Sequence, residues 1–168
     1  MDVVVQDAST LLNLLKCGLL LHAIEALNLH VLTTDLVAAE IRSPREAFDD
    51  AVRRTWVEVR ESTGVQLLSL DKEKRTAKGM SLPDVSVVVL ARTEKCPLFS
   101  SDGAIRAYAQ KHGVAVYGEL WILDQLVTCS RLSPTEAADC LRKMIEHGAR
   151  LPKQEVATRL SRWDEHGR

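Results

Sequence analysis

The sequence predicts an α/β fold in which a central parallel sheet lies between two layers of helices, and three observations support this. The chain has 168 residues, of which 46% are hydrophobic, so it is long enough to bury the core of one domain. It contains only 8 Gly and 5 Pro, which excludes collagen-like and linker-dominated chains. Short β-branched runs alternate with longer segments of helical spacing. Because parallel strands are joined by crossover helices, this alternation favours a three-layer α/β/α domain.

The first half of the chain begins with a β-branched run that ends at Asp7. Leu11 and Leu15 then follow at helical spacing, and Gly18 ends that helix. A strong helix start lies at 43–46, where Ser, Pro and Glu occupy the cap, the first and the third helical positions. The elements expected in this half are strands at 3–5 and 30–32 and helices at 8–16, 20–27, 34–42 and 43–61.

The second half begins with an apolar run at 65–70 that predicts a third strand, followed by a charged, solvated segment at 71–80. A helix that starts at Ser81 is apolar nearly all round over 85–93 and should be buried. The remaining expected elements are strands at 97–100 and 114–117 and helices at 104–112, 119–128, 133–147 and 152–163. We expect an α/β unit at 1–130 and a C-terminal helical extension at 131–168 that packs on the same domain.

Composition and charge argue against several classes of protein. The 22 Lys and Arg nearly balance the 23 Asp and Glu, so no bulk positive field indicates nucleic-acid binding, and basic residues such as Arg150 and Lys153 are predicted to be solvated surface charges. Aromatic residues make up only 4%, which argues against a base-stacking surface. The 4 Cys form no CxxC pair, which favours a reducing compartment over a zinc site or disulfides. Without a signal peptide or a membrane-spanning run, the expected location is the cytoplasm, with no membrane contact.

Acidic residues stand at the ends of two predicted strands. Asp7 follows the strand at 3–5 and Asp102 follows the strand at 97–100, and ligands of open parallel sheets gather at the carboxyl ends of the strands. Glu40 and Asp84 lie in predicted helices among apolar neighbours, where a charge is costly unless it is paired or bound to a metal. Four carboxylates that meet at one sheet edge would form the oxygen-rich site that Mg²⁺ or Mn²⁺ prefers.

Each of the four acids also has a local explanation. Asp7 and Asp102 precede helices, so each could be an ordinary N-cap. Asp84 lies three residues after Ser81 and could be the acidic half of a capping box. Glu40 could face solvent or pair with a nearby arginine. These explanations stay open, but only a shared site accounts for all four acids together.

The order and spacing of these segments resemble a PIN domain. The matching segments are Asp-Ala-Ser-Thr-Leu-Leu at 7–12 after the first strand, Glu40 on a helix, Leu-Pro-Asp at 82–84 and Leu-Phe-Ser-Ser-Asp at 98–102. The helix–Gly–strand unit that follows, at 102–118, resembles the closing unit of the family, so the resemblance spans about residues 2–127. The two C-terminal helices resemble the tail of one toxin-like subgroup.

The resemblance implies a function, because PIN domains are metal-dependent nucleases and many small members are VapC-type toxins of toxin–antitoxin pairs. It implies an endoribonuclease that hydrolyses RNA phosphodiester bonds with Mg²⁺ or Mn²⁺, and a cognate antitoxin protein as partner. The acidic set of the family falls on Asp7, Glu40, Asp84 and Asp102. Asp7 and Asp102 would be direct metal ligands, Asp84 would complete the shell, and Glu40 would bind a second ion or orient the attacking water. Ser100 would hydrogen-bond a ligand carboxylate or a metal-bound water.

The N-terminal helices predict assembly into a homodimer. They carry more apolar surface than one face of a sheet can cover, and family members commonly pair through such helices. The apolar residues concerned are Leu11, Leu12, Leu15, Leu19, Leu20, Ile24 and Leu27.

Two other enzyme or nucleotide-binding classes fit poorly, and one binding class stays open. A haloacid dehalogenase needs a second Asp two residues after Asp7, and that position is Ser9. A Rossmann nucleotide-binding domain needs a Gly-rich turn after the first strand, and residues 6–10 contain no Gly. The alternative that remains is a non-catalytic PIN-like module that binds RNA or protein, against which the complete acidic set argues.

Overall fold

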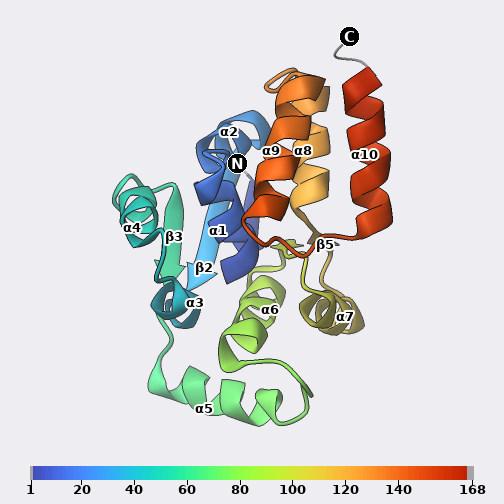
Figure 1. Cartoon of the computed structure of the whole chain (residues 1–168). Helices are drawn as coiled ribbons and strands as arrows, with labels where there is room; N and C mark the ends of the chain where they lie inside the picture. Colours follow the sequence, from blue (N-terminus) through green and yellow to red (C-terminus); the bar gives the residue numbers. More distant parts are fainter. Residues whose placement is uncertain (1, 166–168) are drawn as a thin grey trace.

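The computed structural model describes residues 2–165 and has a five-stranded sheet at its centre (Figure 1). All strand pairs are parallel, and the order across the sheet is β3-β2-β1-β4-β5. The strands are β1 (Asp2–Gln6), β2 (Leu29–Thr34), β3 (Val57–Arg60), β4 (Leu98–Phe99) and β5 (Val116–Tyr117). The predicted parallel sheet is confirmed, and the first strand of the chain lies in its middle.

Helices cover both faces of this sheet, as the three-layer prediction requires. On one face lie α1 (Ala8–Lys16), α2 (Leu20–Leu27) and α8 (Glu119–Thr128), and on the other lie α6 (Leu82–Glu94) and α7 (Gly103–Lys111) (Figure 1). Helix α5 (Gly64–Lys74) packs against α6 from outside. The other helices are α3 (Asp35–Glu40), α4 (Arg45–Arg53), α9 (Pro134–Glu146) and α10 (Lys153–Glu165).

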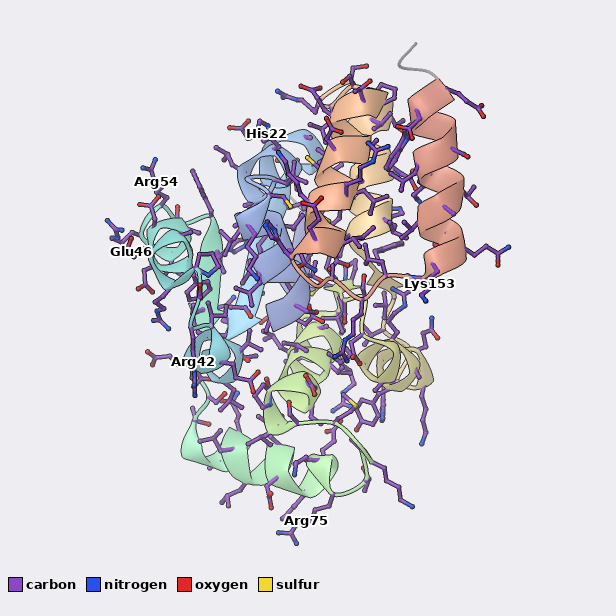
Figure 2. All side chains as sticks on the ribbon, in the orientation of Figure 1. His22, Arg42, Glu46, Arg54, Arg75 and Lys153 are labelled. Carbon is purple, nitrogen blue, oxygen red and sulfur yellow. The ribbon has the colours of Figure 1, made fainter. Side chains whose placement is uncertain are left out.

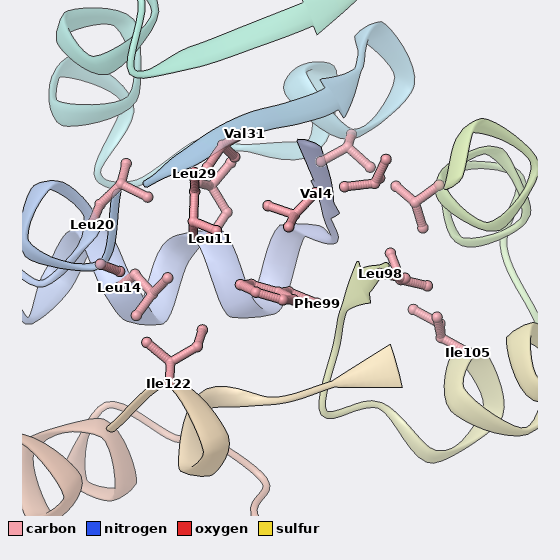
Figure 3. Packing of buried hydrophobic residues seen from close by; sticks show 14 of the residues in the cluster. Val4, Leu11, Leu14, Leu20, Leu29, Val31, Leu98, Phe99, Ile105 and Ile122 are labelled. Atoms are coloured by element: carbon pink, nitrogen blue, oxygen red, sulfur yellow. The ribbon is translucent and has the colours of Figure 1, made fainter. Parts of the chain in front are cut away.

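Successive side chains of the central strands point to opposite faces of the sheet, and this alternation determines which helical layer each one contacts. Val4 of β1 and Val31 of β2 are register partners and pack beside Leu11 of α1 (Figure 3). Val5 and Leu32, the next pair, point to the opposite face because successive strand residues alternate. None of these five side chains exposes more than 2% of its surface. The hydrophobic core therefore continues through the sheet into both helical layers.

Helix α6 is buried as its sequence predicted. Its residues Val85, Val87 and Val88 have no exposed surface. The helix packs against β1, β2 and β4, so it covers the middle of the sheet. A helix in that position meets protein on most sides, which explains why its sequence is apolar nearly all round.

The edge strand β3 lies where the sequence predicted the second half of a helix. Helix α4 ends at Arg53, and Thr55 adopts a positive φ of 60° that turns the chain into β3. Val57 is buried and is the register partner of Val31. The predicted helix at 43–61 is therefore wrong beyond residue 53. The apolar positions of β3, Val57 and Val59, are too few to separate strand from helix periodicity.

The predicted strand at 65–70 is also wrong, because this segment forms α5. The helix begins with a capping box: Thr63 Oγ1 accepts from the Gln66 backbone N–H at 3.3 Å, and the Gln66 side chain accepts from the Thr63 N–H at 2.8 Å. Val65 and Leu68 are 78% and 69% exposed, while Leu70 is buried. The apolar run therefore belongs largely to the surface, and local capping determines its structure.

The C-terminal helices extend the layer that contains α8. Helix α9 packs against α8 and buries Leu141 and Met144 completely, and α10 packs against α9, where Trp163 is 2% exposed. Figure 1 shows α8, α9 and α10 next to one another. This arrangement is that of an extension packed on the α/β unit, and its boundary at residue 130 stays a prediction.

No described helix is by itself long and apolar enough to cross a membrane. Helices α1 and α2 have sufficient length and apolar composition only as a pair, and their axes are bent by 103°. Leu11 and Leu14 of α1 are fully buried in the core of the protein (Figure 3).

Candidate functional site

Asp7 lies directly after β1 and is 3% exposed. It is the N-cap of α1, where its Oδ1 accepts from the Thr10 backbone N–H at 2.8 Å. Its Oδ2 accepts from the Ser100 hydroxyl at 2.5 Å, and the Ser9 hydroxyl donates to both oxygens at 3.1–3.2 Å. Asp7 therefore has the local role that its position suggests and, in addition, a buried bond to another strand.

Ser100 joins the ends of β1 and β4. It is fully buried, and its hydroxyl accepts from the Asp102 backbone N–H at 3.2 Å while it donates to Asp7. Its backbone carbonyl accepts from the Arg106 guanidinium at 2.9 Å. Asp7, Ser100 and Asp102, which are far apart in the sequence, thus lie at one edge of the sheet.

Asp102 caps α7 from the solvent side of this edge. It is exposed, and its Oδ1 accepts from the backbone N–H groups of Ala104 and Ile105 at 2.8 and 3.0 Å. The sequence suggested both an N-cap and a site residue at this position. The structure shows the cap, next to Ser100.

Glu119 is a buried carboxylate that the sequence reading missed. It is the first residue of α8, two positions after β5, and it is 1% exposed. Its Oε1 accepts from Asn13 Nδ2 at 2.8 Å, and its Oε2 accepts from the Ser101 hydroxyl. The preceding residue is Gly118, and a Cβ at this position would lie 2.5 Å from Ser101 Oγ, so a larger residue would displace the hydroxyl that donates to Glu119. The rule that identified Asp7, an acid just beyond a strand end, would also have identified Glu119.

Burial and a neighbouring negative charge perturb Asp7. Burial raises its pKa, the hydrogen bonds from Ser100 and Thr10 lower it, and the negative charge of Glu119 raises it again, to about 6 overall. Neither Asp7 nor Glu119 forms an ion pair with any residue that the structure describes. Two buried like charges without a cation are costly for the folded protein.

Glu40 and Asp84 form a second pair, apart from Asp7 and Glu119. Asp84 completes a capping box at the start of α6: its Oδ2 accepts from the Ser81 N–H at 2.8 Å, and its N–H donates to Ser81 Oγ at 3.2 Å. Glu40 is exposed at the end of α3, and its pKa is raised by partial burial and by the charge of Asp84. The two therefore face each other across α3 and α6.

The expected cluster of four carboxylates is not formed. Within residues 2–165 the structure contains no group of three or more His, Cys, Asp or Glu side chains placed to hold a metal ion. Asp7 and Asp102 meet through Ser100, whereas Asp84 is turned back onto its own helix end. Asp84 is directed at a backbone N–H group by its capping box, and the role of the four acids at one site stays a prediction.

A cavity of about 480 Å³ opens beside Asp102 and Glu119. Ser9, Asn13 and Ser101 line it together with the two acids. Three basic side chains also line it: Lys16 of α1, and His147 and Arg150 from the connection after α9. The cavity is therefore lined by both carboxylates and basic side chains, which suits an anion that approaches a cation held by carboxylates.

The donor atoms around Asp7 fit a hard divalent cation in their chemistry. They are carboxylate and hydroxyl oxygens from Asp7, Ser9, Ser101, Asp102 and Glu119. The uncompensated charges of Asp7 and Glu119 are the feature that a cation would neutralise.

Comparison with models of known protein families shows which family the chain belongs to. A family model described as a PIN domain matches residues 3–165. The chain belongs to the PIN domain family. PIN domains are typically nucleases and generally use divalent metal ions.

Other comparisons of this PIN domain add little. No curated protein matches the chain. Among solved structures, it is similar to a PilT N-terminus domain protein from the hyperthermophilic archaeon Sulfolobus solfataricus P2. That similarity covers 76% of this chain and 92% of the other at 15% sequence identity, with a TM-score of 0.49.

Proposed function

We propose that this PIN domain is a metal-dependent endoribonuclease. The observation that carries the proposal is the pair of buried carboxylates, Asp7 and Glu119, which come from two strand ends and have no cationic partner among the described residues. Burying two like charges weakens a fold, so their arrangement is explained by a ligand and not by stability. A divalent cation between such acids and an RNA phosphate is the ligand that the family's chemistry favours.

The residues that would hold Mg²⁺ or Mn²⁺ are Asp7, Asp102 and Glu119. Glu40 and Asp84, the second pair, would hold another ion or orient the attacking water. When bound, the ion would lower the pKa of a water molecule and stabilise the charge that develops on the phosphate.

Other side chains of the protein position these acids and the substrate. Ser100 holds Asp7 by a hydrogen bond, and Asn13 and Ser101 hold both oxygens of Glu119. Such supporting bonds fix the orientation of a carboxylate that would otherwise rotate. Lys16 and Arg150 line the same cavity as Asp102 and Glu119, where they would attract the phosphates of RNA.

The cellular role belongs to the same proposal. We infer that the nuclease is the toxin of a toxin–antitoxin pair, with a cognate antitoxin protein as partner and the cytoplasm as location. We also infer a homodimer, in which the apolar residues of α1 and α2 that keep part of their surface exposed form the contact; these are Leu12, Leu15, Ile24 and Leu27. Sedimentation that shows a stable monomer at micromolar concentration would contradict the dimer.

Cleavage of a fluorescent RNA tests the enzymatic proposal. We expect the wild type to cleave it with Mn²⁺ or Mg²⁺ and not in excess EDTA. Asp7→Asn should lower the rate at least about 100-fold, because removing a direct metal ligand costs more than removing a supporting residue. Asp71→Asn, an exposed carboxylate on α5, is the matched control and should cleave normally.

The result also separates the enzyme from a binding module. A wild type that binds RNA without cleaving it under any of these metal conditions would support the non-catalytic PIN-like alternative. Full cleavage in EDTA would contradict metal dependence.

A further inference from the structure

The connection between α9 and α10, residues 147–152, lies beside the candidate site. Figure 1 shows it running from the end of α9 past β5 to the beginning of α10. His147 and Arg150 of this connection line the same cavity as Asp102 and Glu119. Pro152 lies against Tyr117 of β5 and Ser101, around a smaller cavity of about 260 Å³. The C-terminal extension therefore forms a wall of the site.

A larger cavity, of about 710 Å³, is also lined by residues of this connection. Its walls are mostly apolar and come from α9, the connection and α10. The apolar residues are Ile145, Ala149, Leu151, Pro152, Val156, Ala157 and Leu160. The charged residues that line it are Arg150 and Lys153, and among the described residues no Asp or Glu does so. Figure 2 shows Lys153 at the beginning of α10.

Arg150 lies between the two cavities. Together with Ser101 and Ala149 it lines both the cavity of the carboxylates and the apolar cavity. Within residues 2–165 neither Arg150 nor Lys153 forms an ion pair, although nine other arginines do. Arginine in this protein is thus usually paired with a neighbouring carboxylate, and Arg150 is an exception at the edge of the site.

We propose that the apolar cavity between α9 and α10 holds a nucleobase of single-stranded RNA, and that Arg150 binds the phosphate next to the cleaved one. The inference rests on the proposed function. Each nucleotide of RNA carries a phosphate and a base. The carboxylates would face the cleaved phosphate, the guanidinium of Arg150 would bind the next phosphate, and the apolar cavity beside Arg150 would take the base. A base enters such a cavity only when it is unpaired, so the substrate is single-stranded at this point.

The chemistry of the cavity favours RNA over a peptide or a second copy of the chain. The planar guanidinium of Arg150 matches a phosphate through two parallel hydrogen bonds. Arg150 and Lys153 are the charged residues that line this cavity, and no Asp or Glu of the described residues lines it, which complements a polyanion. The cavity is open to solvent, and its volume of about 710 Å³ is within the range of small-ligand sites, so there is room for a nucleobase.

Binding of a labelled oligouridine of about ten nucleotides tests the inference. Fluorescence anisotropy is measured with Ca²⁺ in place of Mn²⁺, since its looser coordination supports hydrolysis poorly, and a gel verifies that the RNA stays intact. Arg150→Ala should weaken binding about tenfold and reduce the salt dependence by roughly 0.7 in the log–log slope, the value for one lost phosphate contact. Arg131→Ala, an exposed arginine between α8 and α9 without an ion pair among the described residues, should change the affinity less than about twofold.

A second variant tests the base-binding cavity. Val156→Trp fills it, and this variant should bind the oligouridine about fivefold more weakly than the wild type. An oligonucleotide of the same length with abasic sugars should bind both proteins equally, because it has no base to place in the cavity. Thermal melts verify that each variant is folded.

The outcomes separate this inference from the proposed function. If Arg150→Ala and Val156→Trp bind RNA as tightly as Arg131→Ala does, the inference is overturned even where the wild type cleaves RNA. If the wild type does not cleave RNA but both variants lose RNA binding, the proposed endoribonuclease activity is contradicted and the proposed nucleotide-binding site is supported. If Val156→Trp leaves RNA binding unchanged but converts a dimer to a monomer in sedimentation, the cavity belongs to a contact between two copies and the inference is overturned.

Discussion

The pair Asp7–Glu119 and the pair Glu40–Asp84 contain the same chemical groups in opposite surroundings. Asp7 and Glu119 are 3% and 1% exposed, whereas Glu40 is exposed and Asp84 is half-buried. Asp7 is held by Ser100, 93 positions away, and Glu119 by Asn13, 106 positions away. Asp84 is held by Ser81, three positions away, within its own capping box.

The difference shows which acids a local explanation accounts for. A capping box gives Asp84 a structural role of its own, because its side chain accepts from the Ser81 backbone N–H at the start of α6. A cap does not explain Asp7, since a carboxylate caps a helix equally well when exposed, as Asp102 does. The burial of Asp7 beside Glu119 costs stability, so measurements of stability should separate the two pairs.

The pH dependence of stability gives the largest expected contrast. Asp7 has a pKa of about 6 in the folded protein, above the reference value of 3.8, so the folded state binds this proton more tightly than the unfolded chain. Its contribution to stability is therefore fully present below about pH 4 and is lost as the pH rises through about 6, by about 3 kcal/mol. Urea unfolding in EDTA from about pH 4 to pH 8 should show this loss in the wild type relative to Asp7→Asn. Parallel profiles would show that Asp7 ionises normally.

Stabilisation by Mn²⁺ should distinguish the pairs by a similar amount. An ion that binds only the folded protein adds about 2.7 kcal/mol at a hundredfold excess over its Kd, which is several degrees in Tm. Asp7→Asn, Asp102→Asn and Glu119→Gln should lose most of the shift, and Glu40→Gln should retain most of it. Asp71→Asn controls for the removal of one charge. If Mn²⁺ raised the Tm of all these variants equally, the buried acids would not be metal ligands.

Removing the capping carboxylate of α6 should have a smaller effect on stability. Asp84→Ala leaves the Ser81 N–H without its acceptor and should lower the free energy of unfolding by about 1 kcal/mol. Ser81→Ala, which removes the other half of the box, should cost a similar amount in urea unfolding. The sign is opposite to that expected for Asp7→Asn at neutral pH. If Asp84→Ala raised the free energy of unfolding, Asp84 would destabilise the folded protein as Asp7 is expected to do.

The smallest effect is expected for Glu40→Gln. Partial burial and the charge of Asp84 raise the pKa of Glu40, so its neutral isostere should be slightly more stable. Because Glu40 is exposed, solvent screening should keep the gain within about 0.5 kcal/mol. A gain as large as that of Asp7→Asn, measured by urea unfolding at the same pH, would mean that the two pairs are equally strained.

The sequence predicts the middle of the fold better than its edge. Strand β1 is marked by a β-branched run, β4 by a short apolar run before Asp102, and the buried helix α6 by a capped start, and all three are confirmed. The edge strand β3 is four residues long, too short for its period to be read. Helix α5 contains an apolar run that resembles a strand, and its structure is determined by the Thr63 cap and by the absence of a core position for Val65 and Leu68.

The same limit applies to the site. Asp7 and Asp102 follow predicted strands, so the rule of strand ends brings them to one edge, with Ser100 between them. The rule of strand ends also covers Glu119, but β5 is only two residues long and an acid in the first turn of a helix is ordinary, so nothing local marks this residue as buried. Its burial depends on Asn13 and Ser101, whose proximity only the assembled sheet creates.

The position of the first strand in the middle of the sheet affects how the chain is made. Strand β1 is synthesised first, but its two neighbours are β2 and β4, and β4 begins only at Leu98. A growing chain that ends before Ser100 therefore has Asp7 without its hydroxyl partner, and Glu119 and Arg150 follow later still. Contacts between such distant residues form slowly during folding. The proposed site is therefore complete only after Arg150 has been synthesised.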